Sequence, residues 1–328
     1  METPDLTVAL PTRNRPHLAV AALESVLPQL QEGDELLVVD NGSSGDNLGK
    51  LRDWVDAQPR RAKLLVEPRR GVSFARNLAL HEALNPVVCF VDDDTIACEG
   101  WLDALRRRWR DAPASIGAIG GPMKARWEAA RPEWLADYLL YVVSVLELGP
   151  SWRRLEARPG DYLWGGNLSV RRDAASAVHG FVADEAYLNA VQNGRHAHLF
   201  LTTARSGEEE DLQLRLVGAG YEVWYEPAAA VEHRVAHDRL NKRFFRRFFR
   251  QKGMLAASSG RSRAAAVPVL IRSAARFVVL TLARRPEAPT ATFTLCFGLG
   301  LLAGRRKEAA AAAVPPVAAR EETSLSGP

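Results

Sequence analysis

Residues 6–91 alternate four short apolar runs with stretches of helical periodicity, and this alternation constrains the fold more than any other feature of the sequence. The apolar runs cover residues 6–10, 35–39, 64–67 and 87–91, and the helical patterns cover residues 16–30, 47–57 and 72–83. Strands that are apolar on both faces and joined by helices form a mostly parallel sheet with right-handed crossovers. The alternation therefore predicts an α/β fold in which helices flank a central sheet.

Polar side chains follow each of the four expected strands. In chain order these are Pro11, Thr12 and Arg13, then Asp40, then residues 67–71, and last Asp92, Asp93 and Asp94. In parallel sheets, ligands bind beyond the carboxyl ends of the strands. We therefore expect these side chains to line one binding site.

The three consecutive aspartates have a chemistry of their own. In an extended chain, side-chain alternation places Asp92 and Asp94 on one side. Paired carboxylates suit Mg²⁺ or Mn²⁺, which completes its ligand shell with water and a diphosphate. Such an ion offsets the charge that a nucleoside diphosphate gains as it leaves a sugar. A solvated acidic turn or the start of a helix explains the same three residues without any ligand.

Two further segments suit a nucleotide. Asp40 precedes an Asn-Gly-Ser-Ser turn, where its carboxylate can accept hydrogen bonds from a base or a ribose. The helix expected at 72–83 contains Arg76 and follows Arg69 and Arg70, and helix-terminal amides with nearby cations suit phosphate groups. Each segment is also common as a purely structural turn or helix start.

Taken in order, residues 11–14, 38–43, 71–77 and 90–94 resemble glycosyltransferase family 2, whose members are inverting enzymes with nucleotide-sugar donors. The resemblance covers about residues 6–254 and implies the GT-A fold, with a Rossmann-like, mostly parallel central sheet. It implies that a divalent cation, Mn²⁺ or Mg²⁺, binds at Asp94 and Asp92. The residues that it assigns to the nucleotide are Pro11, Thr12, Arg13, Asp40, Arg76, Asp92 and Asp93.

The acidic run at 208–211 precedes a helical pattern, so the helix dipole alone could explain it. The run is similar to the family's Glu-Asp-x-Asp-Leu motif, whose second acidic residue is the base that removes the proton from the acceptor hydroxyl. By position, this base is Glu209, and Glu208 and Asp211 are the alternatives. Proton removal of this kind contributes roughly 10²–10⁴-fold to the rate of a reaction.

Two later segments complete the resemblance. Residues 226–233 are similar to the family's closing Glu-Pro-x-Ala-x-Val-x-His pattern, which implies that His233 joins the metal ligands. Residues 162–169 resemble the Gly-rich segment beside the donor sugar and the acceptor, and this segment offers Trp164, Gly165, Gly166 and Asn167. A packed histidine, and a packed aromatic followed by a structural glycine turn, are the alternatives without a ligand.

Residues 241–252 form a basic aromatic segment. As a helix, it carries Phe244, Phe245, Phe248 and Phe249 on one face and Arg243, Arg246, Arg247 and Arg250 on the other. Such a helix suits an anionic membrane surface. The alternative is a helix packed on the catalytic domain with a solvated basic face. The apolar stretches at 264–283 and 290–303 either contain arginines or fall short of the ~20 residues of a membrane span.

These patterns divide the chain into a GT-A catalytic domain at 1–235, a basic amphipathic and apolar helical extension at 236–308, and a disordered tail at 309–328. The N-terminus shows no basic stretch followed by an apolar core. Three cysteines without paired spacing suit a reducing compartment. We therefore expect a cytoplasmic protein that associates peripherally with the inner face of the cell membrane.

The sequence predicts a metal-dependent, inverting glycosyltransferase that moves a sugar from a nucleotide-diphosphate sugar to a cell-surface glycan, polysaccharide or lipid-linked acceptor. Basic and aromatic residues together also suit RNA, but an acidic cleft disfavours a nucleic acid polymer. A sugar nucleotidyltransferase is one alternative, although the chain lacks the expected Gly-rich N-terminal loop. A non-catalytic, membrane-attached assembly protein that binds nucleotide sugars is another. The prediction requires that residues 92–94 and 208–211 face one cavity.

Overall fold

The computed structural model describes residues 4–58, 62–157, 161–183, 207–258, 271–272 and 288–303. The expected tail at 309–328, and nearly all of the apolar stretch at 264–283, lie outside these residues.

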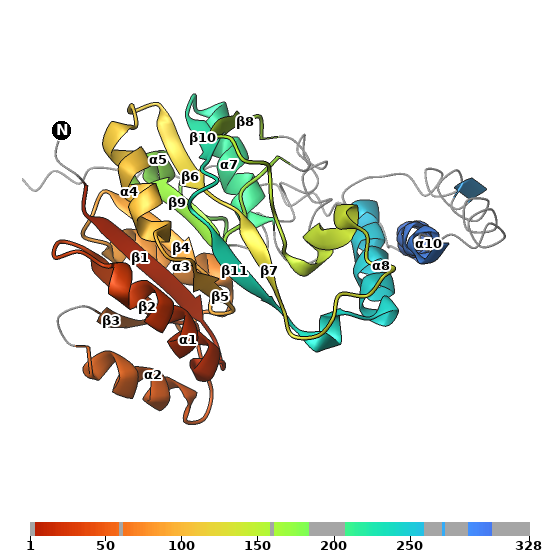
Figure 1. Ribbon diagram of the computed structural model, residues 1–328, viewed down its shortest axis with the longest axis horizontal. Coiled ribbons are helices and arrows are strands. Elements are labelled where there is room, and N and C mark those ends of the chain that lie inside the picture. Colours follow the sequence, from red (N-terminus) through yellow and green to blue (C-terminus); the bar gives the residue numbers. More distant parts are fainter. Residues whose placement is uncertain are drawn as a thin grey trace, which may run out of the picture.

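The described residues form a central sheet of eight strands in the order β3-β2-β1-β4-β9-β6-β10-β8 (Figure 1). The strands are β1 Leu6–Thr12, β2 Glu35–Asp40, β3 Ala62–Val66, β4 Val87–Val91, β6 Ile116–Gly120, β8 Arg153–Leu155, β9 Asn167–Arg171 and β10 Glu222–Tyr225. Strands β1 to β4 pair in parallel, and β6 pairs in parallel with β10. Only β9 and β8 pair with their neighbours in antiparallel fashion within this sheet. The prediction of a mostly parallel sheet is confirmed.

Helices cover both faces of this sheet because its strands are apolar on both sides. Along β2, Leu36 and Val38 contribute to one core, whereas Leu37 and Val39 contribute to the other. The first core includes side chains of the helices α1 Pro16–Val26, α2 Asn47–Asp56 and α4 Trp101–Asp111. The second core includes side chains of α3 Val72–Glu82, α5 Arg172–Ala177 and α7 Glu208–Gly218. The observed helices begin where the sequence predicts them, and the first one ends early at Val26, where a 3₁₀ turn at Leu27–Gln29 follows.

A small second sheet brings the closing histidine to the aspartates. It comprises β5 Thr95–Ala97, β11 Val231–Val235 and β7 Met123–Trp127, in the order β5-β11-β7. In this sheet His233 lies opposite Thr95, and the amide of Arg234 donates a hydrogen bond of 2.9 Å to the carbonyl of Asp94. The register of β11 therefore fixes His233 beside the end of β4.

The helical extension contains α8 Lys242–Ser258 and α10 Ala288–Ala303, which lie side by side at one end of the molecule (Figure 1). Phe245 of α8 is fully buried, and its ring centroid lies 5.0 Å from that of Trp134 and 5.4 Å from that of Phe293. The four arginines on the opposite face of α8 are exposed. The aromatic face is therefore packed on the protein, as in the second of the two interpretations of this helix. Among the described residues, no helix has the length and apolar character needed to cross a membrane.

Candidate active site

A cavity of about 300 Å³ lies beyond the carboxyl ends of β1, β2 and β4. Thirteen of the residues predicted for the site line it: Pro11, Thr12, Arg13, Arg76, Asp92, Asp93, Asp94, Trp164, Gly165, Gly166, Glu208, Glu209 and His233. Asp40, Asn167 and Asp211 are not on its wall. The turn at 92–94 and the start of α7 thus face one cavity, which is the condition that the predicted function sets.

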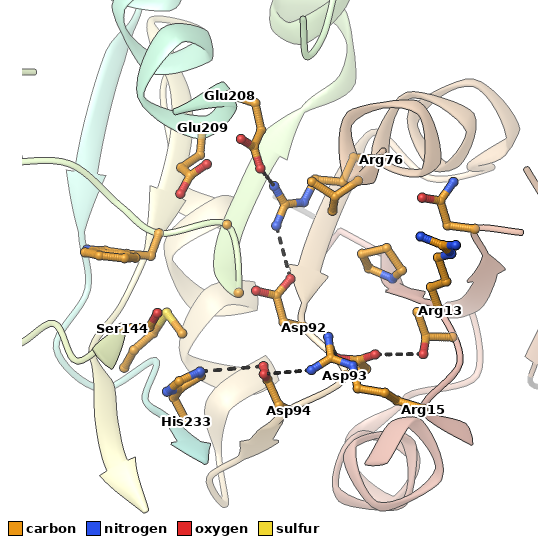
Figure 2. Close-up of a pocket in the computed structure, with 18 of the residues that line it drawn as sticks. Arg13, Arg15, Arg76, Asp92, Asp93, Asp94, Ser144, Glu208, Glu209 and His233 are labelled. Carbon is orange, nitrogen blue, oxygen red and sulfur yellow. Dashed lines mark hydrogen bonds and ion pairs between the residues drawn. The ribbon is translucent and has the colours of Figure 1, made fainter. Parts of the chain in front are cut away.

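The three aspartates do not share one direction, because the chain turns after β4, and they pair with two different arginines (Figure 2). The amide of Thr95 donates a hydrogen bond of 3.1 Å to the carbonyl of Asp92, so the chain is not extended here and side-chain alternation does not apply. Asp92 pairs with Arg76 at 3.1 Å, whereas Asp93 and Asp94 both pair with Arg15, at 2.7 and 3.1 Å. This corrects the reason for placing Asp92 and Asp94 together, although both line the cavity.

Asp93 is the most enclosed of the three, with 2% of its surface exposed. The hydroxyl of Thr12 donates a hydrogen bond of 2.8 Å to its carboxylate. Burial raises the pKa of Asp93 to about 7, although the charge of Arg15 and the hydrogen bond of Thr12 lower it. Asp93 therefore holds Arg15 and Thr12 in place at the cavity wall.

Asp94 and His233 form a pair of possible metal ligands. The Oδ1 atom of Asp94 lies 3.6 Å from Nε2 of His233, and Nδ1 of this histidine has no hydrogen-bond partner among the described residues. Burial lowers the pKa of His233, which favours the neutral imidazole that binds metals. No three His, Cys, Asp or Glu side chains converge as a metal site within the described part of the chain. A carboxylate and an imidazole fit Mn²⁺ or Mg²⁺ if phosphate oxygens and water supply the other ligands.

Arg76 connects the two acidic groups. Its side chain is buried and lies 3.1 Å from both Asp92 and Glu208 (Figure 2). A Cβ atom on Gly165 would lie 2.3 Å from Nη2 of Arg76, and one on Gly166 would lie 2.8 Å from Oδ2 of Asp92. The two glycines therefore leave the space that this bridge occupies.

The acidic run begins α7, and its members differ in their partners. Glu208 pairs with Arg76, and Asp211 pairs with Arg215 at 2.7 Å. Glu209 is 5% exposed, and its Oε2 atom has no hydrogen-bond partner among the described residues. Burial raises the pKa of Glu209 well above its ordinary value; the charge of Glu208 adds to this rise and that of Arg76 opposes it.

Two predicted residues have structural roles in this fold. The amide group of Asn167 is buried and donates hydrogen bonds of 2.9 and 2.8 Å to the carbonyls of Pro122 and Ala229. Its oxygen accepts a hydrogen bond of 2.8 Å from Trp101, so Asn167 is a packing residue rather than a substrate contact. Asp40 accepts a hydrogen bond of 3.0 Å from the amide of Ser43, and its Oδ1 atom is buried without a partner among the described residues.

The cavity also contains residues that the sequence did not single out. Arg15, at the start of α1, is the common partner of Asp93 and Asp94. Arg239 follows β11, and its Nη2 atom lies 3.9 Å from Oδ2 of Asp94. Ser144 lies at the wall near His233 (Figure 2). Arg15 is adjacent to the predicted segment 11–14, whereas no pattern in the sequence points to Arg239 or Ser144.

Comparison with known sequences finds glycosyltransferases. A family model described as glycosyl transferase family 2 matches residues 7–177, slightly more than half of the chain. The glucosyl-dolichyl phosphate glucuronosyltransferase of Haloferax volcanii is 28% identical over 165 residues, which are 48% of this chain and 49% of that protein. The succinoglycan biosynthesis protein ExoM of Rhizobium meliloti is 27% identical over 252 residues, 75% of this chain and 73% of that protein. This chain therefore spans about half the length of the first relative.

Solved structures show the same architecture. The mannosyltransferase PcManGT from Pyrobaculum calidifontis, in complex with GDP-Man and Mn²⁺, superposes with a TM-score of 0.54 at 17% identity. The superposition covers 92% of this chain and 70% of that chain. At this identity the likeness concerns the fold alone, and it confirms the prediction of a GT-A architecture for the described part of the chain.

Proposed function

This chain belongs to glycosyltransferase family 2, and we propose that it is an inverting enzyme that moves a sugar from a nucleoside-diphosphate donor to a glycan, polysaccharide or lipid-linked acceptor. One observation carries the proposal. Asp94 at the end of β4 and Glu209 at the start of α7 are distant in the sequence, yet both line the same cavity. A glycosyl transfer needs a charged group near the leaving diphosphate and a separate carboxylate near the acceptor.

We assign the donor to the wall formed by β1, β2 and β4. Pro11 and Thr12 end β1, Arg13 follows it, and all three line the cavity beside Asn41. Arg13, Arg15 and Arg239 provide cations for the phosphate groups. In this assignment Asp92 contacts the ribose. The resemblance assigns the nucleobase to Asp40, but this side chain is buried off the cavity wall, so in this assignment it acts by orienting the turn after β2 through the hydrogen bond from the amide of Ser43.

Asp94 and His233 would hold the divalent cation, with Asp92 as a further ligand if it leaves Arg76. When bound, such an ion stabilises the negative charge that accumulates on the departing diphosphate. The complex of PcManGT with GDP-Man and Mn²⁺ supports this choice of ligand class.

On the opposite side, Glu209 takes the proton of the acceptor hydroxyl. The acceptor oxygen forms its bond to the anomeric carbon as the bond from that carbon to the diphosphate oxygen breaks, with its electron pair leaving on the diphosphate. The proton passes from the hydroxyl to Glu209, and the configuration at the anomeric carbon inverts. Glu209 must be ionised to act, so activity should fall as the pH falls through its pKa, and the raised pKa moves this loss to a higher pH than an ordinary glutamate would give.

A thermal-shift panel of nucleotides and nucleotide sugars, with and without Mn²⁺, tests the donor assignment. We expect a diphosphate nucleotide to raise the melting temperature in the presence of Mn²⁺, because a ligand at 100 times its Kd stabilises by about 2.7 kcal/mol. Asp94→Ala should abolish the part of the shift that depends on Mn²⁺. Equal shifts without metal in the wild-type protein would contradict the metal assignment.

Product analysis distinguishes the alternative functions. A glycosyltransferase releases a nucleoside diphosphate from the nucleotide sugar and forms a glycoside. Pyrophosphate release from a nucleoside triphosphate and a sugar phosphate would instead show a nucleotidyltransferase. Tight donor binding without transfer to any extract-derived acceptor would show a non-catalytic assembly protein.

We further propose that the helical extension, residues 236–308, attaches the protein to the inner face of the cell membrane. The catalytic domain, residues 1–235, would then lie against this surface. The exposed arginines of α8 support this, since each cation near an anionic surface contributes about 1 kcal/mol. Co-sedimentation should retain the protein on vesicles of anionic lipid and release it from vesicles of neutral lipid. A variant with serine at Arg243, Arg246, Arg247 and Arg250 should remain unbound on both.

A further inference from the structure

Gln213 of α7 is a fully buried amide that hydrogen-bonds to the main chain at two places. Its exposed surface is 0%. The Oε1 atom accepts a hydrogen bond of 2.8 Å from the amide of Leu163, and the Nε2 atom donates one of 2.9 Å to the carbonyl of the same residue. The Nε2 atom also donates a hydrogen bond of 2.8 Å to the carbonyl of Glu209. One side chain thus ties the first turn of α7 to the chain at Leu163.

Both of the segments that Gln213 joins belong to the site. Leu163 directly precedes residues 164–166, which lie on the cavity wall. Glu209 lies on the same wall, and its side chain extends from the start of α7 toward the cavity (Figure 2). Gln213 itself is not on this wall. It therefore fixes two parts of the site relative to each other without touching a ligand.

The partners of Gln213 require a side chain that both donates and accepts. Leu163 is 1% exposed and offers an N–H group and a carbonyl, and Glu209 offers a second carbonyl. A carboxylate at position 213 could accept from the N–H group but would face two carbonyl oxygens. An apolar side chain would leave all three groups without this partner, which is unfavourable for buried polar groups. An amide satisfies all three.

Resting on the proposed function, we propose that Gln213 is a positioning residue of the glycosyl transfer, which holds the base Glu209 in a fixed place relative to the wall formed by residues 164–166. The Oε2 atom of Glu209 has no hydrogen-bond partner among the described residues, so the main chain of α7 has a large part in placing this carboxylate. A general base must lie within hydrogen-bond reach of the proton that it takes. The family model that matches residues 7–177 does not extend to Gln213.

This role separates turnover from nucleotide binding. The hydrogen bonds of Gln213 go to Leu163 and Glu209, whereas the donor wall is formed by β1, β2 and β4. Loss of the Gln213 side chain should therefore misplace the base and leave the donor wall intact. A side chain that served stability alone would affect both functions together.

Hydrogen exchange tests the tie without any substrate. We compare the wild type with Gln213→Met, in which a side chain of similar shape makes none of the three hydrogen bonds. The control is Leu216→Ala, because Leu216 is a fully buried residue of the same helix that is not on the cavity wall. The exchange rate of peptides covering residues 162–167, relative to that of β1 in the same variant, should rise about tenfold in Gln213→Met and keep its wild-type ratio in Leu216→Ala.

Kinetics test the consequence for the base. In Gln213→Met we expect kcat to fall by about 10²-fold, because a displacement of about 1 Å at a reacting group has an effect of this size. The Kd of the nucleoside diphosphate, measured by calorimetry with Mn²⁺, should stay within about twofold of the wild-type value. Leu216→Ala should lose stability and keep both constants.

A second variant, Gln213→Glu, tests the tie by melting temperature and serves if Gln213→Met does not fold. The introduced carboxyl group can donate to one carbonyl only when it is protonated, so the fold should raise its pKa. Such a group stabilises the fold below its unfolded pKa, and this contribution is lost as the pH rises through the folded pKa. The melting temperature of Gln213→Glu should therefore approach that of the wild type at pH 5 and fall behind it at pH 8.

Unchanged exchange of residues 162–167 in Gln213→Met would overturn the inference, as would a constant difference in melting temperature between Gln213→Glu and the wild type. A parallel loss of kcat and nucleotide binding in Gln213→Met would also overturn it, because it would indicate a role in stability alone. If exchange rises as expected but the wild type transfers no sugar, the tie stands and the proposed function fails.

Discussion

The carboxylates on the two sides of the cavity differ in whether they form ion pairs. On the strand side, Asp92, Asp93 and Asp94 each pair with an arginine within 3.1 Å. On the helix side, Glu209 and Glu210 are buried with oxygen atoms that have no partner among the described residues. A paired carboxylate is stable and fixed in direction, which suits a surface that holds a ligand. Burial also raises the pKa of Asp93, to about 7, although its ion pair with Arg15 opposes the rise. Glu209 has no such ion pair among the described residues, and its raised proton affinity suits a group that must take a proton.

This contrast predicts that removing a charge has opposite consequences on the two sides. On the strand side, a substitution should cost stability because it leaves a buried partner without its counterpart. On the helix side, a substitution of Glu209 should cost activity and leave stability intact. The following changes test this, from the largest expected effect to the smallest.

Glu209→Gln should lower kcat by about 10² to 10⁴, because the amide cannot take the acceptor proton. The melting temperature should not fall, because an uncharged amide replaces a carboxylate that burial disfavours. Asp211→Asn is the matched control within the same turn, since Asp211 faces Arg215 and is not on the cavity wall. Loss of turnover in Asp211→Asn with full activity in Glu209→Gln would reverse the assignment of the base.

Phe245→Ala should destabilise the protein by about 3–5 kcal/mol, because this ring is fully buried between Trp134 and Phe293. Denaturant unfolding measures the effect, and Arg247→Ala, at an exposed position of the same helix, should change stability by less than about 0.5 kcal/mol. Equal unfolding midpoints for the two variants would show that the aromatic face of α8 is not docked.

Gly165→Ala tests how tightly the bridge between the two sides is packed. The new Cβ atom would lie 2.3 Å from Nη2 of Arg76, whose ion pairs with Asp92 and Glu208 prevent it from moving freely. We expect a loss of about 1–3 kcal/mol in unfolding free energy, together with weaker donor binding by calorimetry. Gly218→Ala in α7 is the control, because nothing lies within 4 Å of its new Cβ atom. Because Gly218 is the last residue of α7, that change should not lower stability and should raise it by less than the roughly 0.5–1 kcal/mol expected inside a helix.

Local patterns in the sequence predicted the sheet and much of the strand side. Apolar runs and turn residues are contiguous in the chain, so the ends of β1 and β4 could be located before the structure was known. The residues with which each charged side chain pairs were not predictable from local patterns. Arg15 acquires its role from ion pairs with Asp93 and Asp94, which lie far from it in the sequence.

A motif match also does not fix the direction of a side chain. Asn167 stands in the Gly-rich segment beside Gly166, which lines the cavity. Its own side chain points away and ties β9 to the carbonyls of Pro122 and Ala229. The turn after β4 likewise changes the directions of the aspartate side chains. The hydrogen bond from the amide of Thr95 to the carbonyl of Asp92 closes this turn, and Asp92 and Asp94 pair with different arginines. Such details depend on tertiary packing, which periodicity does not record.

Thr12→Val carries the smallest expected effect and tests the strand side directly. The substitution keeps the shape of the side chain and removes the hydroxyl that donates 2.8 Å to the buried carboxylate of Asp93. We expect a loss of about 1–2 kcal/mol in unfolding free energy, because a hydrogen bond to a charged acceptor is removed while the acceptor stays buried. Urea unfolding above the pKa of about 7 that burial gives Asp93, where this carboxylate is ionised, measures the loss against the wild type. A variant as stable as the wild type would mean that Arg15 alone satisfies Asp93, and the contrast with Glu209 would then rest on ion pairs rather than on hydrogen bonds.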